Sequence, residues 1–440
     1  MISLINKKIK DIQLKNNNIF YLLILAFCLF LPYQFALNPK VGFDLAIVRV
    51  IIPMLFLSYA FFAMKNKINI FNFNKVTSLL LLLLTLEIIS LFFSHNLTWS
   101  IRKLVFPLSI FPIYFLAVSI LNTYQKKRAA LLALLGGATI LAAIAILQFI
   151  SQFIFGIDPV YAFLANTTAP FFLGKSFAAS VLAYPSWLVN SNGITYMRAT
   201  ATFPDPHMLS YYFGMLIPWS VALWATTTKH KKLLAISVIL LLIADALTFT
   251  RGGYLALIAG SLIILPLVSL KTAKKIILGC LIFVLLFTIA PHNPVAGRLV
   301  SSFDTQEGSN QARLSNWEQA IAIISSKPFG VGIGNYSLAV NPTATYREPI
   351  YAHNAYLDIA AEIGIPAAII FILLLFSVFK SFWILSKKQP FFIAGASSVA
   401  IFSVHSLVEN PLYSVHILPL FLIIIALNTK NIVHEKDTTN

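Results

Sequence analysis

Charged side chains are scarce in this sequence: they make up 11% of its 440 residues, while 58% of the residues are hydrophobic. So apolar a composition excludes a soluble globular protein and indicates a polytopic membrane protein. Two cysteines occur, Cys28 and Cys280, both inside apolar runs, which excludes a disulfide framework and a cysteine-rich metal site. Repeats with a period of about 20–50 residues and Gly/Ser-rich linkers are also lacking. We therefore expect a single membrane domain over residues 1–440.

The apolar runs are each about 20 residues long and show no period-2 alternation, which favours helices over a β-barrel. The first run ends in a poor cleavage site, so we interpret it as a retained span. The sequence predicts an all-α polytopic membrane protein with about 12 transmembrane helices. We place them at residues 19–37, 44–63, 76–94, 103–121, 129–155, 208–227, 233–249, 253–270, 275–291, 364–385, 390–408 and 412–428. Two large loops, 156–207 and 292–357, remain, and the second contains an amphipathic helix over 311–325 that we expect on the membrane surface.

The net charge of +17 does not indicate a nucleic-acid partner, because the lysines form short clusters between the apolar runs. Each cluster follows an even-numbered span, which predicts that both termini are cytoplasmic and that the two large loops are periplasmic. Arginine predominates on the outer side, where topology does not require cations. Guanidinium groups bind oxyanions in a bidentate way, so we expect an anion-binding outer face.

The segment Tyr351–Gly364 places His353 where a polar loop enters an apolar run. If the helix includes His353, Ala360 and Gly364 lie beneath it and Asp358 lies on the far face. A helix N-terminus disfavours the imidazolium, so the sequence predicts a neutral imidazole that can act as a general base. The alternative is an interfacial histidine that only caps the helix.

Arg251 follows a predicted span on a short outer turn, and a charge so close to hydrocarbon usually marks function. It could instead snorkel to the interface. Arg313 could be a solvated charge of the amphipathic helix, and Arg198 could stabilise its loop. Arg347, six residues before His353, is a weaker candidate for a functional residue. We interpret two carboxylates inside spans, Glu87 and Asp245, as buried hydrogen-bond partners rather than a proton path.

Arginines beside one neutral base suit a polyprenyl-diphosphate-linked sugar donor, because guanidinium groups stabilise the departing diphosphate and the acceptor hydroxyl requires a base. The sequence has no Asp-x-Asp motif or carboxylate cluster, so we expect no metal and no cofactor. A transporter is the alternative from another class. It is disfavoured because a transporter places its ionisable groups near the bilayer midplane.

At these residues the chain resembles the bacterial O-antigen ligase/O-antigen polymerase family. The resemblance covers residues 197–412 and rests on the order of its motifs. They are Arg198…Phe203-Pro204-x-Pro206, Thr250-Arg251-Gly252, Arg313-x-x-x-Trp317, Pro328-x-Gly330-x-Gly332-x-Gly334, His353-Asn354-x-Tyr356-Leu357 with Gly364, and His405-Ser406-x-x-Glu409.

The resemblance implies a metal-independent inverting glycosyltransferase of the bacterial inner membrane, with its active site facing the periplasm. The donor would be an undecaprenyl-diphosphate-linked glycan. His353 would be the base, and Glu409 a carboxylate that orients the site. The predicted substrate-binding residues are Arg251, Arg313, Arg198, Arg347 and Tyr351.

The acceptor is less constrained. In the polymerase branch paired R-x(10)-G loops are often described, but neither Arg198 nor Arg313 has glycine at that spacing. This departure favours an O-antigen ligase acting on lipid A–core. Polymerisation of O-antigen, and transfer of the glycan to a protein, stay open as alternatives.

Overall fold

The computed structural model describes residues 18–40, 42–183, 186–191, 193–264, 308–346, 348 and 350–429. Six helical segments in this part are long and apolar enough to cross a membrane. They are α2 (Val48–Lys65), α3 (Lys75–Ile89) with η2 (Ser90–Phe93), α4 (Leu97–Ile110) with α5 (Pro112–Ile120), α6 (Tyr124–Phe155), α10 (Pro206–Thr226) and α18 (Ile365–Ser386). Each overlaps a predicted span, which supports the predicted helical membrane class.

Shorter helices account for most of the other predicted spans. They are Asn18–Tyr33, α11 (Lys231–Ala246), α12 (Arg251–Ile264), η6 (Pro390–Phe392) with α19 (Ile393–His405), and α20 (Ile417–Ala426). The predicted span at 275–291 and the end of the one at 253–270 lie outside the described residues. The count of about 12 spans and the orientation in the membrane therefore stay predictions.

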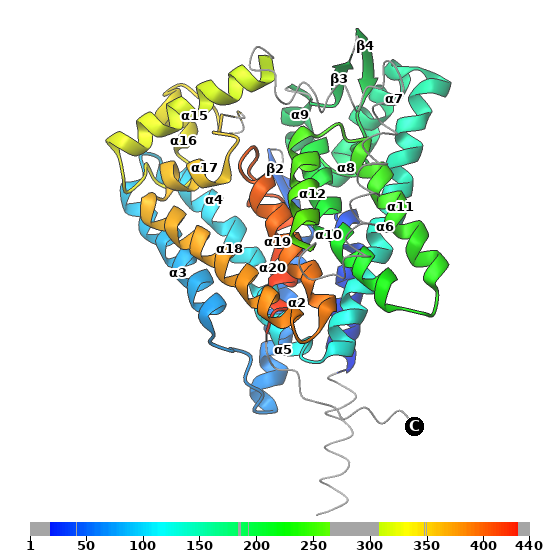
Figure 1. The fold of residues 1–440 in the computed structure, drawn as a ribbon. Coiled ribbons are helices and arrows are strands. Elements are labelled where there is room, and N and C mark those ends of the chain that lie inside the picture. Colours follow the sequence, from blue (N-terminus) through cyan, green and yellow to red (C-terminus); the bar gives the residue numbers. More distant parts are fainter. Residues whose placement is uncertain are drawn as a thin grey trace, which may run out of the picture.

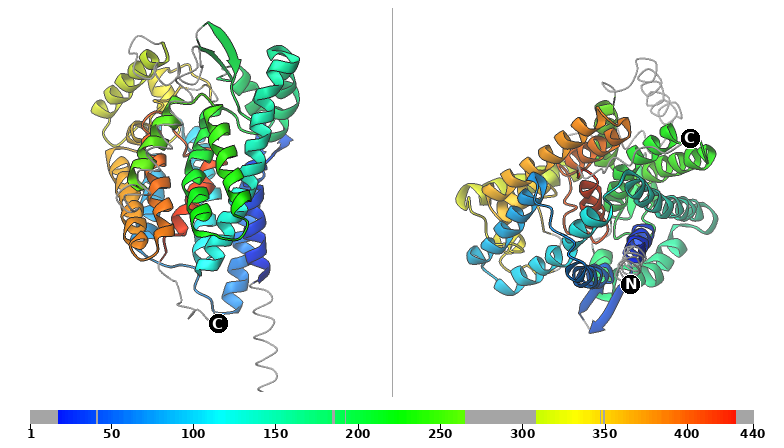
Figure 2. Two further views of the ribbon diagram at one scale, coloured as in Figure 1. Left: turned by 45° about the vertical axis from the view of Figure 1, so that its right-hand side comes forward. Right: turned by 90° about the horizontal axis from the view of Figure 1, so that it is seen from below.

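The last predicted span, 412–428, is too long. Its helix α20 begins only at Ile417, where Ser414 Oγ accepts hydrogen bonds from the N–H groups of His416 and Ile417. All ten residues of α20 are buried, and the helix lies at the centre of the bundle (Figure 2, right). Hydropathy does not separate such a buried core helix from a lipid-facing span. Residues 406–416 consequently form a loop between α19 and α20.

Two small antiparallel hairpins interrupt the helical fold, and the sequence did not predict them. The first joins β1 (Ala36–Lys40) to β2 (Phe43–Ala46), so the first helix ends earlier than expected. The second joins β3 (Leu188–Ser191) to β4 (Ile194–Met197), with Val189 opposite Tyr196. Each contains a glycine with positive φ at its turn, Gly42 or Gly193, a conformation that glycine adopts without strain.

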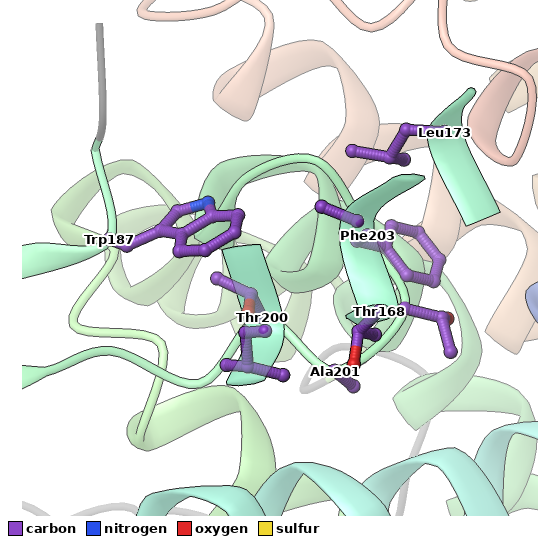
Figure 3. A pocket seen from close by; sticks show the side chains of 9 residues that line it. Thr168, Leu173, Trp187, Thr200, Ala201 and Phe203 are labelled. Atoms are coloured by element: carbon purple, nitrogen blue, oxygen red, sulfur yellow. The ribbon is translucent and has the colours of Figure 1, made fainter. Parts of the chain in front are cut away.

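The predicted loop 156–207 is largely folded. It contains α7 (Ile157–Phe163), the π-helix η3 (Leu164–Thr168), α8 (Ala169–Leu173), α9 (Lys175–Ala183) and the second hairpin. These elements pack around the indole of Trp187, whose Nε1 donates to the carbonyl of Pro204 at 2.8 Å. A small pocket lies beside Trp187, Thr200 and Phe203 (Figure 3). This packing fixes the segment that leads into α10.

The helix predicted at 311–325 is present as α15 (Gly308–Ser326), but its apolar residues do not gather on one face, so the predicted amphipathic character was wrong. Its place on the membrane surface stays a prediction. The helix packs on α17 (Ala355–Glu362) through a cluster that includes Ala320, Tyr336 and Ala361. Leu314 and Ile321, two of its apolar residues, are about half exposed. The helices α15, α16 (Tyr336–Val340) and α17 gather at the same end of the bundle as the β3–β4 hairpin (Figure 1).

Helices α10, α12 and α19 form the tightest part of the core and reach the same end (Figure 1; Figure 2, left). Small residues allow this approach: Ser397 Oγ donates to the carbonyl of Gly260, and Ser398 Oγ donates to that of Met215. A methyl group on Gly260 would lie 2.4–2.7 Å from the side chain of Ile401. This close packing fixes the N-terminal ends of α10 and α12 beside the C-terminal end of α19.

Candidate active site

His353 lies outside α17, because Asn354 is the N-cap and the helix begins at Ala355. The amide oxygen of Asn354 accepts from the N–H groups of Tyr356 and Leu357, as a capping residue does. His353 itself has φ of +52°, which is uncommon for a residue other than glycine. The helical-wheel prediction that put Ala360 and Gly364 beneath His353 was therefore wrong, since it assumed helical geometry through the histidine.

The imidazole of His353 contacts Glu409 from the 406–416 loop. Its Nδ1 lies 3.3 Å from Glu409 Oε2, and the two side chains are 29% and 5% exposed. Burial lowers the pKa of His353, but the charge and hydrogen bond of Glu409 outweigh this effect and raise the pKa above its usual value. The sequence predicted an imidazole kept neutral by the helix N-terminus, whereas the structure favours its protonated form through Glu409.

Glu409 is held as a carboxylate. Burial raises the pKa of Glu409, yet His353, His207 and the N–H of Asn410 together lower it to about 2. The Asn410 N–H donates to Glu409 Oε1 at 3.1 Å, which leaves Oε2 for His353. An ionised Glu409 holds the proton of the histidine on Nδ1, so Nε2 is the nitrogen able to accept a proton.

Asp358 ties the histidine loop to the glutamate loop. Its Oδ1 accepts from the N–H of Ala352 at 2.8 Å, and its Oδ2 accepts from Asn410 Nδ2 at 3.0 Å. The sequence placed Asp358 on the far face of the helix. The left-handed turn at His353 brings the chain back over this carboxylate instead. The two bonds fix the backbone on either side of the His353–Glu409 contact.

The start of α10 adds two groups that the sequence reasoning missed, Asp205 and His207. Asp205 caps the helix, with Oδ1 accepting from the N–H of Met208 at 2.9 Å. Burial and the charge of Glu409 raise the pKa of Asp205 to about 6. His207 interacts electrostatically with Glu409 and Arg313. The Asp205-Pro206 pair before a predicted span is a helix-start signal that could have drawn attention to this turn.

The guanidinium of Arg198 binds the turn before α12. Its Nε donates to the carbonyl of Thr248 at 2.7 Å, and its Nη2 donates to Thr250 Oγ1 at 3.2 Å. Nη1 donates to the carbonyl of Ser186 at 3.0 Å, and only 4% of Arg198 is exposed. This geometry favours a structural role in the 248–250 turn, which was the alternative to substrate binding.

Arg251 is the first residue of α12 and is 7% exposed. The two glycines that follow it bring α12 against the end of α19. A methyl group on Gly252 would lie 2.5 Å from Val408 and 3.0 Å from His405. Arg251 is therefore anchored next to the loop that carries Glu409.

Arg313 and Tyr351 approach the histidine from the side of α15. The charge of Arg313 acts on His353 and on His405, and it opposes the effect of Glu409 on the pKa of His353. The ring of Tyr351 lies 4.1 Å from that of His353, centroid to centroid. Burial raises the pKa of the Tyr351 hydroxyl well above its usual value, so the hydroxyl keeps its proton. The predicted substrate-binding residue Arg347 lies outside the described residues.

Two comparisons bear on the relatives of this chain. A family model described as O-antigen ligase matches residues 236–372, a segment that includes Arg251, Arg313 and His353. An O-antigen polymerase from Salmonella muenchen is 25% identical over 200 residues, which are 43% of this chain and 49% of that protein. The chain thus spans about half the length of this relative. The predicted resemblance to the O-antigen ligase and polymerase family is confirmed.

The match to the O-antigen ligase model does not reach Arg198 or Glu409. The structure nevertheless brings Glu409 to His353 across 56 positions of sequence. His405, four residues before Glu409, is fully buried, with its ring stacked 3.7 Å from that of Tyr211. Within the described ranges, neither nitrogen of His405 has a hydrogen-bond partner. We interpret His405 as part of the packed floor of the site.

A metal ion would need several convergent ligands. In the part of the chain that the structure describes, no group of three or more His, Cys, Asp or Glu side chains is placed to hold one. His353 and Glu409 are instead engaged with each other. Metal-independent chemistry stays a prediction, which a chelator can test.

Proposed function

We propose that this chain is a membrane glycosyltransferase that transfers a glycan from an undecaprenyl-diphosphate carrier to an acceptor hydroxyl. The observation that carries the proposal is the contact between His353 Nδ1 and Glu409 Oε2. The charge of Arg313 acts on this histidine, and Arg251 begins the helix whose Gly252 packs against Val408 and His405, just before Glu409. The matches to an O-antigen ligase family model and to an O-antigen polymerase agree with this chemistry. By the positive-inside prediction, the site faces the periplasm of a bacterial inner membrane.

His353 would act as the general base. The acceptor hydroxyl gives its proton to Nε2 while its oxygen forms a bond to the anomeric carbon. The bond from that carbon to the diphosphate oxygen breaks, and its electron pair leaves with the diphosphate. A single displacement of this kind inverts the anomeric configuration. Glu409 stabilises the imidazolium that forms, as a carboxylate does for a catalytic histidine.

Arg251 and Arg313 would stabilise the negative charge that develops on the departing diphosphate. Guanidinium groups suit this task because they remain charged and bind phosphate oxygens in a bidentate way. Arg251 is fixed by the packing of α12 on α19, so its position needs little reorganisation. Arg198 would contribute indirectly, by holding the turn that precedes Arg251. Tyr351 would shield one face of the histidine ring.

We propose lipid A–core as the acceptor, which makes the chain an O-antigen ligase. The family model described as O-antigen ligase supports this choice. The second candidate is an O-antigen polymerase, and the relative from Salmonella muenchen that carries this name supports it. Both reactions use the same donor and base and differ in the hydroxyl that attacks.

The lipopolysaccharide of a deletion strain distinguishes these candidates. Loss of a ligase leaves long glycan chains on the lipid carrier and none on lipid A–core. Loss of a polymerase leaves lipid A–core with at most one repeat unit. Complementation with the wild-type chain, and with His353→Ala as the matched control, shows whether the defect depends on the proposed base. Normal lipopolysaccharide in the deletion strain would contradict both candidates.

A further inference from the structure

A second pair of arginines, Arg49 and Arg102, lies apart from the His353 site. Arg49 belongs to the first turn of α2, and Arg102 to the first half of α4. Both helices, α2 and α4, begin at the end of the bundle where α15, α16 and α17 lie. Arg49 lies over the ring of Phe106, which follows Arg102 by four residues in α4, so the two arginines lie along the same face of that helix. Neither arginine belongs to the candidate active site.

Each of these arginines is held by neutral groups. Arg49 Nε donates to Ser109 Oγ at 3.2 Å, and its guanidinium lies 5.4 Å above the ring of Phe106. The guanidinium of Arg102 lies 4.2 Å above the ring of Tyr346. That ring is fixed in turn by an edge contact with Trp99, at 5.3 Å between centroids. These contacts orient the guanidinium groups, and among the described residues only Arg49 Nε of the two side chains donates a hydrogen bond.

Across the described ranges, neither Arg49 nor Arg102 has a carboxylate within ion-pair distance. The neighbouring Lys103 differs, because its Nζ lies 2.6 Å from Glu362 Oε2. The carboxylate of Glu362 is thus already paired with Lys103. Two like charges that are held together without a counter-charge repel each other. An anion bound between them would remove this repulsion.

The 406–416 loop connects this pair to the candidate active site. Glu409 on this loop faces His353, whereas Tyr413, four residues later, lies beneath Lys103 at 4.2 Å. The ring of Tyr413 also contacts Phe106, the residue under Arg49, at 6.0 Å between centroids. The arginine pair therefore lies across the loop from the histidine.

We propose that Arg49, Arg102 and Tyr346 form a binding site for a phosphate group, separate from the diphosphate site at Arg251 and Arg313. Phosphate suits two forked guanidinium groups, since each can bind two of its oxygens. The phosphate belongs either to a lipid headgroup or to free inorganic phosphate. The inference does not depend on the proposed transfer reaction, because it concerns binding alone.

The test measures lipid retention by the purified full-length chain, using native mass spectrometry in neutral detergent. Dioleoyl phosphatidic acid is the probe, and dioleoylglycerol is the matched lipid without phosphate. We expect selective retention of phosphatidic acid. Arg49→Gln and Arg102→Gln should each weaken it roughly tenfold, the loss expected for hydrogen bonds to a charged group.

Lys175→Gln is the matched control, because it removes an exposed cation from α9 without touching the pair. Displacement of the lipid by inorganic phosphate would identify the free ion as a ligand as well. Persistence of the lipid under the same excess would identify the headgroup as the ligand. Retention in both arginine variants equal to that of Lys175→Gln would overturn the proposal.

Two further variants guard against misfolding and against confusion with transfer activity. Arg102 is exposed, so its replacement does not disturb the core, and Arg49→Lys keeps the charge at the half-buried position. His353→Gln should retain phosphatidic acid like the wild type even though glycan transfer fails. A loss of transfer thus tests the proposed function, and a loss of lipid retention tests this site.

Discussion

Replacing Glu409 by glutamine removes the negative charge beside His353 and changes little else. The amide has the same size, and its oxygen can still accept the N–H of Asn410, which donates to Oε1 at 3.1 Å. The neutral amide cannot stabilise an imidazolium at 3.3 Å. We expect the pKa of His353 to fall, because burial and the charge of Arg313 both lower it once the carboxylate is gone.

The expected loss of rate in Glu409→Gln can be derived from the pKa of Glu409, the partner of His353. The pKa of Glu409 falls from an ordinary value of 4.5 to about 2, which corresponds to roughly 3 kcal/mol at about 1.4 kcal/mol per unit. His207 and the Asn410 N–H share this stabilisation with His353. The pKa of His353 shifts less because burial and Arg313 oppose Glu409. A loss of about 1–3 kcal/mol in the transition state lowers the transfer rate roughly 10- to 100-fold.

The assay is the steady-state rate of glycan transfer in proteoliposomes as a function of pH. Transfer needs the unprotonated base, so the wild-type rate rises with pH as His353 loses its proton. Because Glu409 raises the pKa of His353, this rise lies at higher pH than for an ordinary histidine. In Glu409→Gln the rise should move to lower pH, and the plateau should fall.

Asp205 has a pKa of about 6 and could produce a rise in the same range. Asp205→Asn is the control, since asparagine also caps helices. The same rise should remain in this variant. An unchanged pH profile and plateau in Glu409→Gln would refute the pairing argument.

Three further predictions concern Arg251, Gly364 and the dependence of transfer on a metal ion. Arg251→Lys keeps the charge but loses the bidentate fork, so kcat for transfer should fall about tenfold; an unchanged kcat would exclude diphosphate stabilisation by Arg251. Gly364→Ala should lower the free energy of unfolding by about 1–3 kcal/mol, because Gly364 has φ of +106° and a methyl group would lie 2.8 Å from Phe329. Gly308→Ala, at an open position, is its control in thermal unfolding. EDTA should leave the transfer rate unchanged, and a loss that Mg²⁺ restores would contradict metal-independent chemistry.

The helices that the sequence predicted well are those with long uninterrupted apolar runs. The run over 129–155, for example, lies within α6 (Tyr124–Phe155). The signal is weaker where apolar residues serve the protein core. The buried helix α20 was predicted as a full span, because hydropathy reports the apolar character of a segment and not what surrounds it.

The candidate site was predictable in its residue types and only partly in its geometry. Arg251 stood out because a charge near hydrocarbon is unusual, and His353 because it lies where a polar loop enters an apolar run. The left-handed conformation of His353 could not be predicted, because an Ala-His-Asn sequence is also compatible with a helix that starts one residue earlier. The hydrogen bonds that Asp358 accepts from Ala352 and Asn410 depend on that turn. They could not be derived from helical periodicity.

The conformation of the glycines before α16 could likewise not be derived from the sequence. Gly330, Gly332 and Gly334 belong to one of the motifs on which the family resemblance rests. The structure holds them with positive φ against neighbouring backbone, and the Gly332 N–H donates to the carbonyl of Glu362 at 2.9 Å. Gly330 and Gly332 contact Glu362, whereas Gly334 lies against Trp99 and Lys103. Sequence spacing alone does not reveal these contacts.

The central claim is that His353 takes the proton of the acceptor hydroxyl. His353→Gln should leave binding of the lipid-diphosphate donor intact, because the proposed diphosphate partners are Arg251 and Arg313. Its transfer rate should fall by about 10²- to 10⁴-fold, the usual contribution of a general base. The deciding measurement is therefore the single-turnover transfer rate of His353→Gln with saturating bound donor. A fall of this size supports the assignment, and a rate equal to that of the wild type contradicts it.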